Sequence, residues 1–154
     1  MSGLPRIIHY AWFGDGQLSD LNKQCMRTWQ DVAPEYEIRC WDEQNFPGEL
    51  TYEQRCVYER AMEGKFFSNV SNMVRLIALQ KYGGVYLDTD VEVLRPPHEA
   101  HKWEDLVCGW ESEFFVNSAV LMATGDNWVL RGCLDRLHGK EVEFKRRLGS
   151  RDTR

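Results

Sequence analysis

The sequence has no apolar run near the roughly 20 residues that a helix needs to cross a bilayer. Its amino terminus also lacks the basic start and continuous apolar stretch of a secretory signal peptide. We therefore expect no transmembrane segment and a location in the cytoplasm. Attachment to the inner face of the membrane is left open.

Basic residues are also fewer than acidic ones. The chain has 19 Lys and Arg against 24 Asp and Glu, a formal net charge of −5, which argues against binding nucleic acid through its phosphates. The basic residues Lys145, Arg146 and Arg147 lie in the segment 141–154, which we expect to be a solvated tail. Attraction of this tail to a membrane surface or a partner is the less favoured alternative.

The five cysteines form no C-x-x-C pair and are widely spaced. A structural zinc site and a disulfide framework are therefore both unsupported. We expect reduced, mostly buried thiols. The cysteines are Cys25, Cys40, Cys56, Cys108 and Cys133.

Internal repeats, low-complexity segments and domain linkers are also missing, so the 154 residues predict one domain over 1–140 followed by the tail. A chain of this length can bury about two-thirds of its unfolded surface. Strands are expected at 7–13, 36–41, 85–93, 106–110 and 118–123. Helices are expected at 19–31, 52–62, about 69–82 and 127–137. The alternation predicts an α/β layer structure with a largely parallel sheet.

Two carboxylates, Asp88 and Asp90, directly follow the apolar run Val85-Tyr86-Leu87. On a strand they would point the same way, roughly 6–7 Å apart along the backbone. Like charges so close repel unless a cation lies between them, and a divalent ion that also binds phosphates would serve. The carboxyl end of a strand is where open α/β sheets bind ligands. The alternative is a solvated or salt-bridged turn, as in most isolated D-x-D sequences.

The preceding segment predicts a buried helix that carries one arginine, Arg75. We expect Ser68 or Asn69 to cap the start of this helix and Gly83-Gly84 to end it. Because a buried guanidinium keeps its charge, Arg75 needs either a carboxylate such as Asp88 or an anionic ligand. The core-facing positions are Val70, Met73, Val74, Ile77 and Ala78.

Other polar and aromatic residues admit two interpretations each. Trp12 could stack on a base or belong to the core, and the Tyr86 hydroxyl could reach a ligand or simply pack. His9 is interpreted as a satisfied structural group. Asn117-Ser118 slightly favours a ligand contact over an ordinary loop-to-strand junction. The acidic pair Glu111 and Glu113 is expected on an exposed strand face, with an acceptor-site role as the minority view.

The pattern Ser71-Asn72-x-x-Arg75, then Gly84 after eight residues, then Tyr86-Leu87-Asp88-Thr89-Asp90 resembles the sugar-binding region of glycosyltransferase family 32. That family includes bacterial capsule transferases and yeast mannosyltransferases, and the glucosylating domains of large clostridial toxins are similar in this region. Residues 4–14 look like the family's opening strand and 34–41 like its second strand. The resemblance runs from about residue 4 to 125.

The resemblance implies an α/β, GT-A-like fold with a mixed, mostly parallel sheet flanked by helices. It also implies a metal-dependent hexosyltransferase-like enzyme of polysaccharide biosynthesis, acting with retention. Its partners would be a nucleotide-sugar donor and a glycan or other acceptor. Asp90, assisted by Asp88, would hold Mn²⁺ or Mg²⁺, and Arg75 would stabilise the leaving diphosphate. The donor contacts implied are Trp12 at the base and Ser71, Asn72, Arg75, Tyr86, Asp88 and Asn117 around the sugar and ribose.

Two departures from the family pattern keep alternatives open. Asn72 stands where related proteins often carry Asp, which changes a carboxylate to an amide. The chain also ends at Arg154 without the usual carboxy-terminal segment, so a non-catalytic nucleotide-sugar-binding module is the runner-up. In a third reading, a structural interaction domain, Arg75 and the aspartates would be salt-bridged to one another. An oligomer is compatible with all three.

Overall fold

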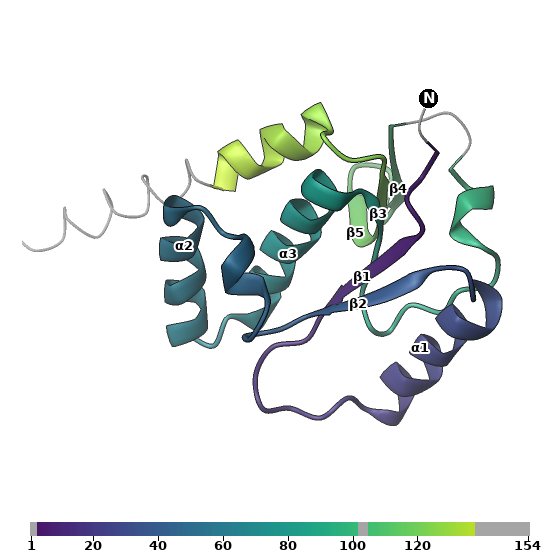
Figure 1. Cartoon of the computed structure of the whole chain (residues 1–154), viewed down its shortest axis with the longest axis horizontal. Helices are drawn as coiled ribbons and strands as arrows, with labels where there is room; N and C mark the ends of the chain where they lie inside the picture. The colour runs from purple at the N-terminus through teal and green to yellow at the C-terminus, as the bar shows by residue number, and fades with distance from the viewer. Residues whose placement is uncertain (1–2, 102–104, 138–154) are drawn as a thin grey trace, which may run out of the picture.

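A five-stranded sheet runs through the centre of the chain, with helices on both faces (Figure 1). This computed structural model describes residues 3–101 and 105–137. The strands are β1 (Ile7–Ala11), β2 (Glu37–Trp41), β3 (Gly84–Leu87), β4 (Leu106–Trp110) and β5 (Val116–Ala123).

The strand order is β2-β1-β3-β5-β4. The three strands β2, β1 and β3 are parallel, whereas β5 is antiparallel to both of its neighbours. Four of the five strands therefore point the same way. The expected mixed, mostly parallel sheet is confirmed.

The helices divide between the two faces of the sheet (Figure 1). Helix α1 (Asp20–Val32) covers one face, and α2 (Tyr52–Glu63) and α3 (Phe67–Tyr82) cover the other. Short 3-10 turns, η1 (Phe46–Glu49) and η2 (Pro97–Glu99), interrupt the connections. Residues 128–137 are also helical, and Asn127 caps them as expected, since its Oδ1 accepts from the Val129 amide at 2.9 Å.

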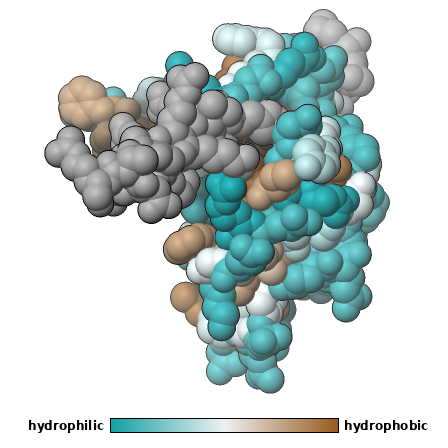
Figure 2. Space-filling model, turned by 90° about the vertical axis from the view of Figure 1, so that its left-hand side faces the viewer, coloured by the Kyte–Doolittle hydropathy of each residue, from teal (hydrophilic) through white to brown (hydrophobic). Residues whose placement is uncertain are grey.

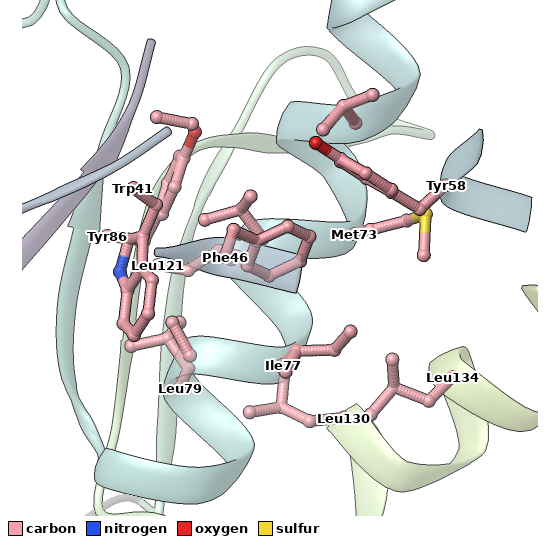
Figure 3. Close-up of a cluster of buried hydrophobic side chains, with 14 of the residues drawn as sticks. Trp41, Phe46, Tyr58, Met73, Ile77, Leu79, Tyr86, Leu121, Leu130 and Leu134 are labelled. Atoms are coloured by element: carbon pink, nitrogen blue, oxygen red, sulfur yellow. The ribbon is translucent and has the colours of Figure 1, made fainter. Parts of the chain in front are cut away.

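The core has two halves because successive side chains of β3 point to opposite faces. Val85 and Leu87 pack toward α1, in the cluster that contains Trp29. Tyr86 faces α3 and joins the larger cluster shown in Figure 3. All four β3 residues are buried, and each large apolar side chain stabilises the fold by roughly 1.5–3 kcal/mol.

Glycines let α3 turn directly into β3. Gly83 ends the helix with φ +64°, as expected from the Gly-Gly sequence. A Cβ on Gly84 would lie 2.5 Å from the Ile7 carbonyl oxygen, so only glycine allows β3 to approach β1 this closely. The expected cap at Ser68 or Asn69 is wrong, because the helix begins earlier, at Phe67, without a side-chain cap.

The strand before the two aspartates is shorter than expected. β3 ends at Leu87, and residues 88–90 turn away, closed by a Val91 amide to Asp88 carbonyl bond of 3.0 Å. The expected continuation through Val93 is wrong, because Val91 and Val93 pack against α1 instead of pairing in the sheet. The Val93 amide donates to Thr28 Oγ1 of that helix at 2.8 Å.

Two further expectations need correction. All five thiols are free, but only Cys25 is buried; Cys133 is exposed and the rest are half-buried. Glu111 and Glu113 are exposed as expected, yet they lie in the β4–β5 loop and not on a strand. The basic tail 141–154 lies outside the described residues.

The described part of the chain has no helix both long and apolar enough to cross a bilayer. On the face shown in Figure 2, apolar side chains form small patches within a mostly hydrophilic surface.

Candidate functional site

A cavity of about 420 Å³ opens at the carboxyl ends of β1 and β3. Its size suits a small-molecule ligand. Four segments contribute its walls: the end of β1, the start of α1, the start of α3 and the turn after β3. The lining residues are Ala11, Trp12, Phe13, Asn22, Phe67, Ser68, Ser71, Tyr86, Asp88, Thr89 and Asp90.

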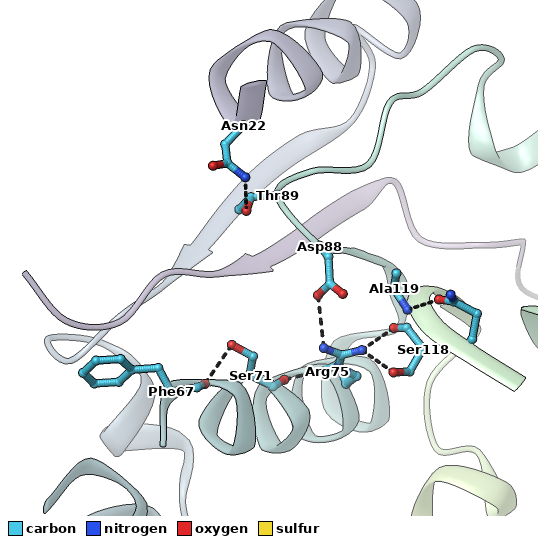
Figure 4. A network of polar contacts seen from close by, with 9 residues as sticks. Asn22, Phe67, Ser71, Arg75, Asp88, Thr89, Ser118 and Ala119 are labelled. Carbon is cyan, nitrogen blue, oxygen red and sulfur yellow. Dashed lines mark hydrogen bonds and ion pairs between the residues drawn. The ribbon is translucent and has the colours of Figure 1, made fainter. Parts of the chain in front are cut away.

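The turn that carries the two aspartates is fixed from both sides. The Asp88 amide donates to the Ala119 carbonyl of β5 at 2.9 Å. From α1, Asn22 Nδ2 donates to Thr89 Oγ1 at 2.9 Å (Figure 4). Cys25 Sγ of the same helix donates to the Asp90 carbonyl at 3.4 Å. The backbone is thereby held while the Asp90 side chain stays exposed to solvent.

Arg75 lies beside this turn and is only 6% exposed. Its Nη2 donates to Asp88 Oδ1 at 3.0 Å, and its Nη1 donates to both the carbonyl and Oγ of Ser118 at 2.5 Å (Figure 4). Its Nε points to the Ser71 carbonyl at 3.4 Å, and its guanidinium carbon lies 4.8 Å from the centre of the Tyr86 ring. Of the two expected partners, the structure shows the carboxylate.

Negative charge at the turn exceeds what Arg75 offsets. Burial raises the pKa of Asp88; the Arg75 charge opposes this shift, and the neighbouring Asp90 adds to it. The turn therefore carries two carboxylates, and Arg75 pairs with Asp88. An added cation would stabilise this arrangement.

A divalent ion fits this donor set if other ligands complete its shell. Within residues 3–101 and 105–137, no group of three or more His, Cys, Asp or Glu side chains could hold a metal. The protein thus offers the two carboxylates Asp88 and Asp90. Mg²⁺-like ions are commonly held by one or two carboxylates together with substrate phosphates and water.

Tyr86 and Trp12 both border the cavity but differ in how far they are exposed to solvent. Tyr86 is 1% exposed, and burial raises its pKa despite the Arg75 charge and a hydrogen bond with Ser71. The Tyr86 ring lies against the Arg75 guanidinium, and a ligand contact of its hydroxyl stays a prediction. Trp12 is half-buried, and its Nε1 donates to the Gly16 carbonyl at 2.7 Å, which fixes the indole at the rim.

Two residues expected at the site lie apart from the cavity lining. Asn72 is exposed on α3, although Arg75 one turn later is buried. Asn117 uses its Oδ1 to accept from the Ala119 amide at 2.6 Å. The next residue, Ser118, makes the contact with Arg75.

The sequence interpretation omitted Asn22. For Ser118 it favoured a ligand contact and did not include the bond to Arg75. Asn22 has a local signal, because Ser19-x-x-Asn22 forms a capping box at the start of α1. Nothing in that local pattern indicates its contact with Thr89, 67 positions later.

His9 has the structural role expected of it. It is fully buried, accepts from Trp41 Nε1 on Nδ1 at 3.1 Å, and so donates from Nε2 to the Gly83 carbonyl at 2.9 Å. Burial lowers its pKa to about 4, because the charged imidazolium is disfavoured there. A neutral imidazole satisfied on both nitrogens is a structural link between β1, β2 and the end of α3.

With this geometry established, the comparisons identify the family. Residues 19–107, which include the Asp88-Thr89-Asp90 turn, match the glycosyltransferase sugar-binding region containing a DXD motif. The chain belongs to this glycosyltransferase family. No curated protein sequence matches the chain.

A solved structure supports the fold assignment. The PaToxG glycosyltransferase aligns with a TM-score of 0.75 at 14% identity, over 91% of this chain and 61% of that one. The chain thus spans about three-fifths of the length of this relative. At such low identity the likeness shows the fold alone, and the expected GT-A-like fold is confirmed.

Proposed function

We propose that the protein is a metal-dependent glycosyltransferase that moves a sugar from a nucleotide-sugar donor to a glycan or other acceptor. The observation that carries the proposal is the fixed turn that presents Asp88 and Asp90 at the mouth of a ligand-sized cavity. Two carboxylates with one cationic partner form a site suited to a metal-bound diphosphate.

Asp90 would be the main protein ligand of Mn²⁺ or Mg²⁺, because its carboxylate is exposed and its backbone is held by α1. Asp88 would assist it with the oxygen that Arg75 does not occupy. When bound, such an ion supplies Lewis-acid stabilisation of the charge that grows on the departing diphosphate.

The remaining cavity residues would position the donor. Trp12, fixed at the rim, offers a ring on which the base can stack. Ser71 and Asp88 offer hydrogen-bonding groups to the sugar hydroxyls. Arg75 would act mainly by holding Asp88 in place and offsetting its charge, since its donors already point to protein oxygens.

The proposal includes retention of the anomeric configuration, which the family resemblance implies. Of the two carboxylates that line the cavity, Asp88 pairs with Arg75, and Asp90 would hold the ion under this proposal. Neither would then serve as the general base that an inverting transfer requires. NMR of the anomeric proton in the first-formed product distinguishes the two outcomes.

The test is release of nucleoside diphosphate and free sugar from a panel of nucleotide sugars with Mn²⁺. We expect slow turnover of at least one donor, loss of that turnover in EDTA, and loss in Asp90→Ala. Glu92→Ala is the matched control, because Glu92 is an exposed carboxylate two residues later that lies outside the cavity lining. Turnover that survives in Asp90→Ala would contradict the proposal.

A second candidate, a nucleotide-sugar-binding module without turnover, is favoured by one observation. Arg75 is engaged by Asp88 and Ser118, so it presents little free charge to a leaving diphosphate. Metal-dependent donor binding with no release of nucleotide from any donor in the panel would support this candidate over the enzyme.

A further inference from the structure

The end of the β4–β5 hairpin exposes a cluster of large apolar side chains. We call Trp110, Phe114, Phe115 and Val116 the hairpin tip; their exposed fractions are 76%, 83%, 67% and 51%. Exposed apolar residues that occur singly are ordinary, whereas a contiguous group marks an interaction site.

The register of the sheet places the hairpin tip beside the candidate site. Leu87 at the end of β3 pairs with Val120 of β5, and Asp88 bonds to Ala119. Because β5 is antiparallel to β3, its earlier residues extend past the edge where the aspartates lie. Val116 is two residues before Ser118, the partner of Arg75, or roughly 7 Å along the strand.

The backbone of the hairpin holds the tip in place. A register shift between Cys108 and Gly109 interrupts the β4–β5 pairing just before Trp110, and such bulges often redirect side chains next to active sites. The Glu111 amide donates to the Phe115 carbonyl at 2.8 Å, which closes the loop.

The loop combines aromatic rings with carboxylates. Glu111 and Glu113 lie between Trp110 and Phe114 and are exposed. The C–H groups on one side of a pyranose ring form an apolar patch that can lie on the negatively polarised face of an aromatic ring. Carboxylates accept hydrogen bonds from the sugar hydroxyls. Both kinds of contact are therefore available within one short loop.

Charge disfavours two of the other occupants. An anionic membrane or a nucleic acid would be repelled by Glu111 and Glu113 on a chain of net charge −5. Sugar rings match the combination of aromatic and carboxylate side chains in this loop.

We propose that the hairpin tip binds a glycan and presents it as the acceptor to the donor site. This inference deepens the proposed function and rests on it for the acceptor role, although glycan binding itself can be measured alone. The aromatic rings would hold sugar units next to the one that reacts, and Glu111 and Glu113 would fix their orientation.

The experiment measures binding of defined tetrasaccharides of glucose, mannose, galactose and N-acetylglucosamine to the full chain by ligand-observed NMR. We expect saturable binding of at least one, weakened at least tenfold in Trp110→Ala/Phe114→Ala. Trp128→Ala is the matched control, because Trp128 is 78% exposed on the helix over residues 128–137. The Trp128 variant should bind like the wild type.

The proposal would be overturned if no tetrasaccharide binds, if the double variant binds as well as the wild type, or if Trp128→Ala loses as much binding as the double variant. Sedimentation that shows self-association of the wild type, removed in the double variant, would assign the tip to a second copy and also overturn it.

Failure of this inference is separable from failure of the proposed function. The thermal shift caused by nucleotide sugar with Mn²⁺ reports the donor site, and the double variant should keep it in full. If no nucleotide sugar shifts the melting temperature of the wild type but a glycan still binds, the tip is a glycan-binding surface without an acceptor role.

Discussion

Two polar groups lie buried next to the same three parallel strands, and they differ in what completes their interactions. His9 is neutral, and Trp41 and Gly83 satisfy both of its ring nitrogens inside the protein. Arg75 is charged, and its counter-ion Asp88 lies at the wall of the cavity, with a side chain 35% exposed. The first network is closed and the second opens onto solvent.

This difference separates structural from functional burial. A neutral imidazole needs one donor and one acceptor, which the fold supplies completely. A guanidinium needs negative charge, and the carboxylate that provides it is next to a second one, Asp90, with no cation of its own among its described contacts. Of these two networks, only the one around Arg75 retains negative charge that a bound cation could neutralise.

The largest expected effect comes from breaking the open network. Arg75→Met should lower the free energy of unfolding by about 3–4 kcal/mol, because Asp88 loses its counter-ion and Ser118 loses two hydrogen bonds. Urea denaturation monitored by circular dichroism measures this change.

Arg39→Met is the matched control for that variant. Arg39 also pairs with a carboxylate, Glu37, and also lies 4.8 Å from a tyrosine ring, Tyr82, but Glu37 is largely exposed. Its loss should cost under about 1 kcal/mol. Equal costs at the two arginines would contradict the contrast, and adding Asp88→Asn to Arg75→Met should recover part of the lost stability.

The pH dependence of stability tests the closed network around His9. Because the pKa of His9 falls from 6.5 to about 4 on folding, the unfolded chain binds more protons between these values, and stability drops as pH falls. Between pH 7.5 and 4.5 the wild type should lose about 2 kcal/mol more than His9→Gln. Urea denaturation at each pH compares them, and parallel losses would show that His9 is not the group responsible.

Removing Asp90 should separate function from stability. Because its side chain is exposed, Asp90→Ala should change the free energy of unfolding by less than about 0.5 kcal/mol. The same variant should lose metal-dependent release of nucleotide from the donor. A large loss of stability would instead assign Asp90 to the fold.

The smallest effect is expected at Asn72. The sequence placed it among the donor contacts, whereas the structure places it in solvent, outside the cavity lining. Asn72→Ala should keep the affinity for the donor within about twofold of the wild-type value. Ser71→Ala, on the cavity wall, should lower this affinity more than Asn72→Ala does. Titration calorimetry with Mn²⁺ present compares the two, and the reverse order would restore the sequence interpretation.

The sequence was informative where the deciding interactions are local. Ser19 as a helix cap, Gly83 as a helix end and the strand Leu106–Trp110 follow from short-range patterns, and the structure confirms them. The strand was expected to continue through Val93, and this was wrong because packing of Val91 and Val93 against α1 overrides their β-strand propensity.

The same limit applies to the site. The need of Arg75 for a partner, and Asp88 as a candidate, followed from the chemistry of a buried charge. The contribution of Ser118 did not, because it depends on β5 lying next to β3, 43 positions from Arg75. The helical spacing of Asn72 and Arg75 also failed to show that one is exposed and the other buried.

The central claim is that the turn carrying Asp88 and Asp90 binds a nucleotide sugar through a divalent ion. The most direct measurement is the melting temperature of the wild type and of Asp90→Ala with a panel of nucleotide sugars, with and without Mn²⁺. The account predicts stabilisation of the wild type that requires both the ion and a suitable donor and is absent in Asp90→Ala. A melting temperature that no donor raises, or that Asp90→Ala raises equally, would contradict it.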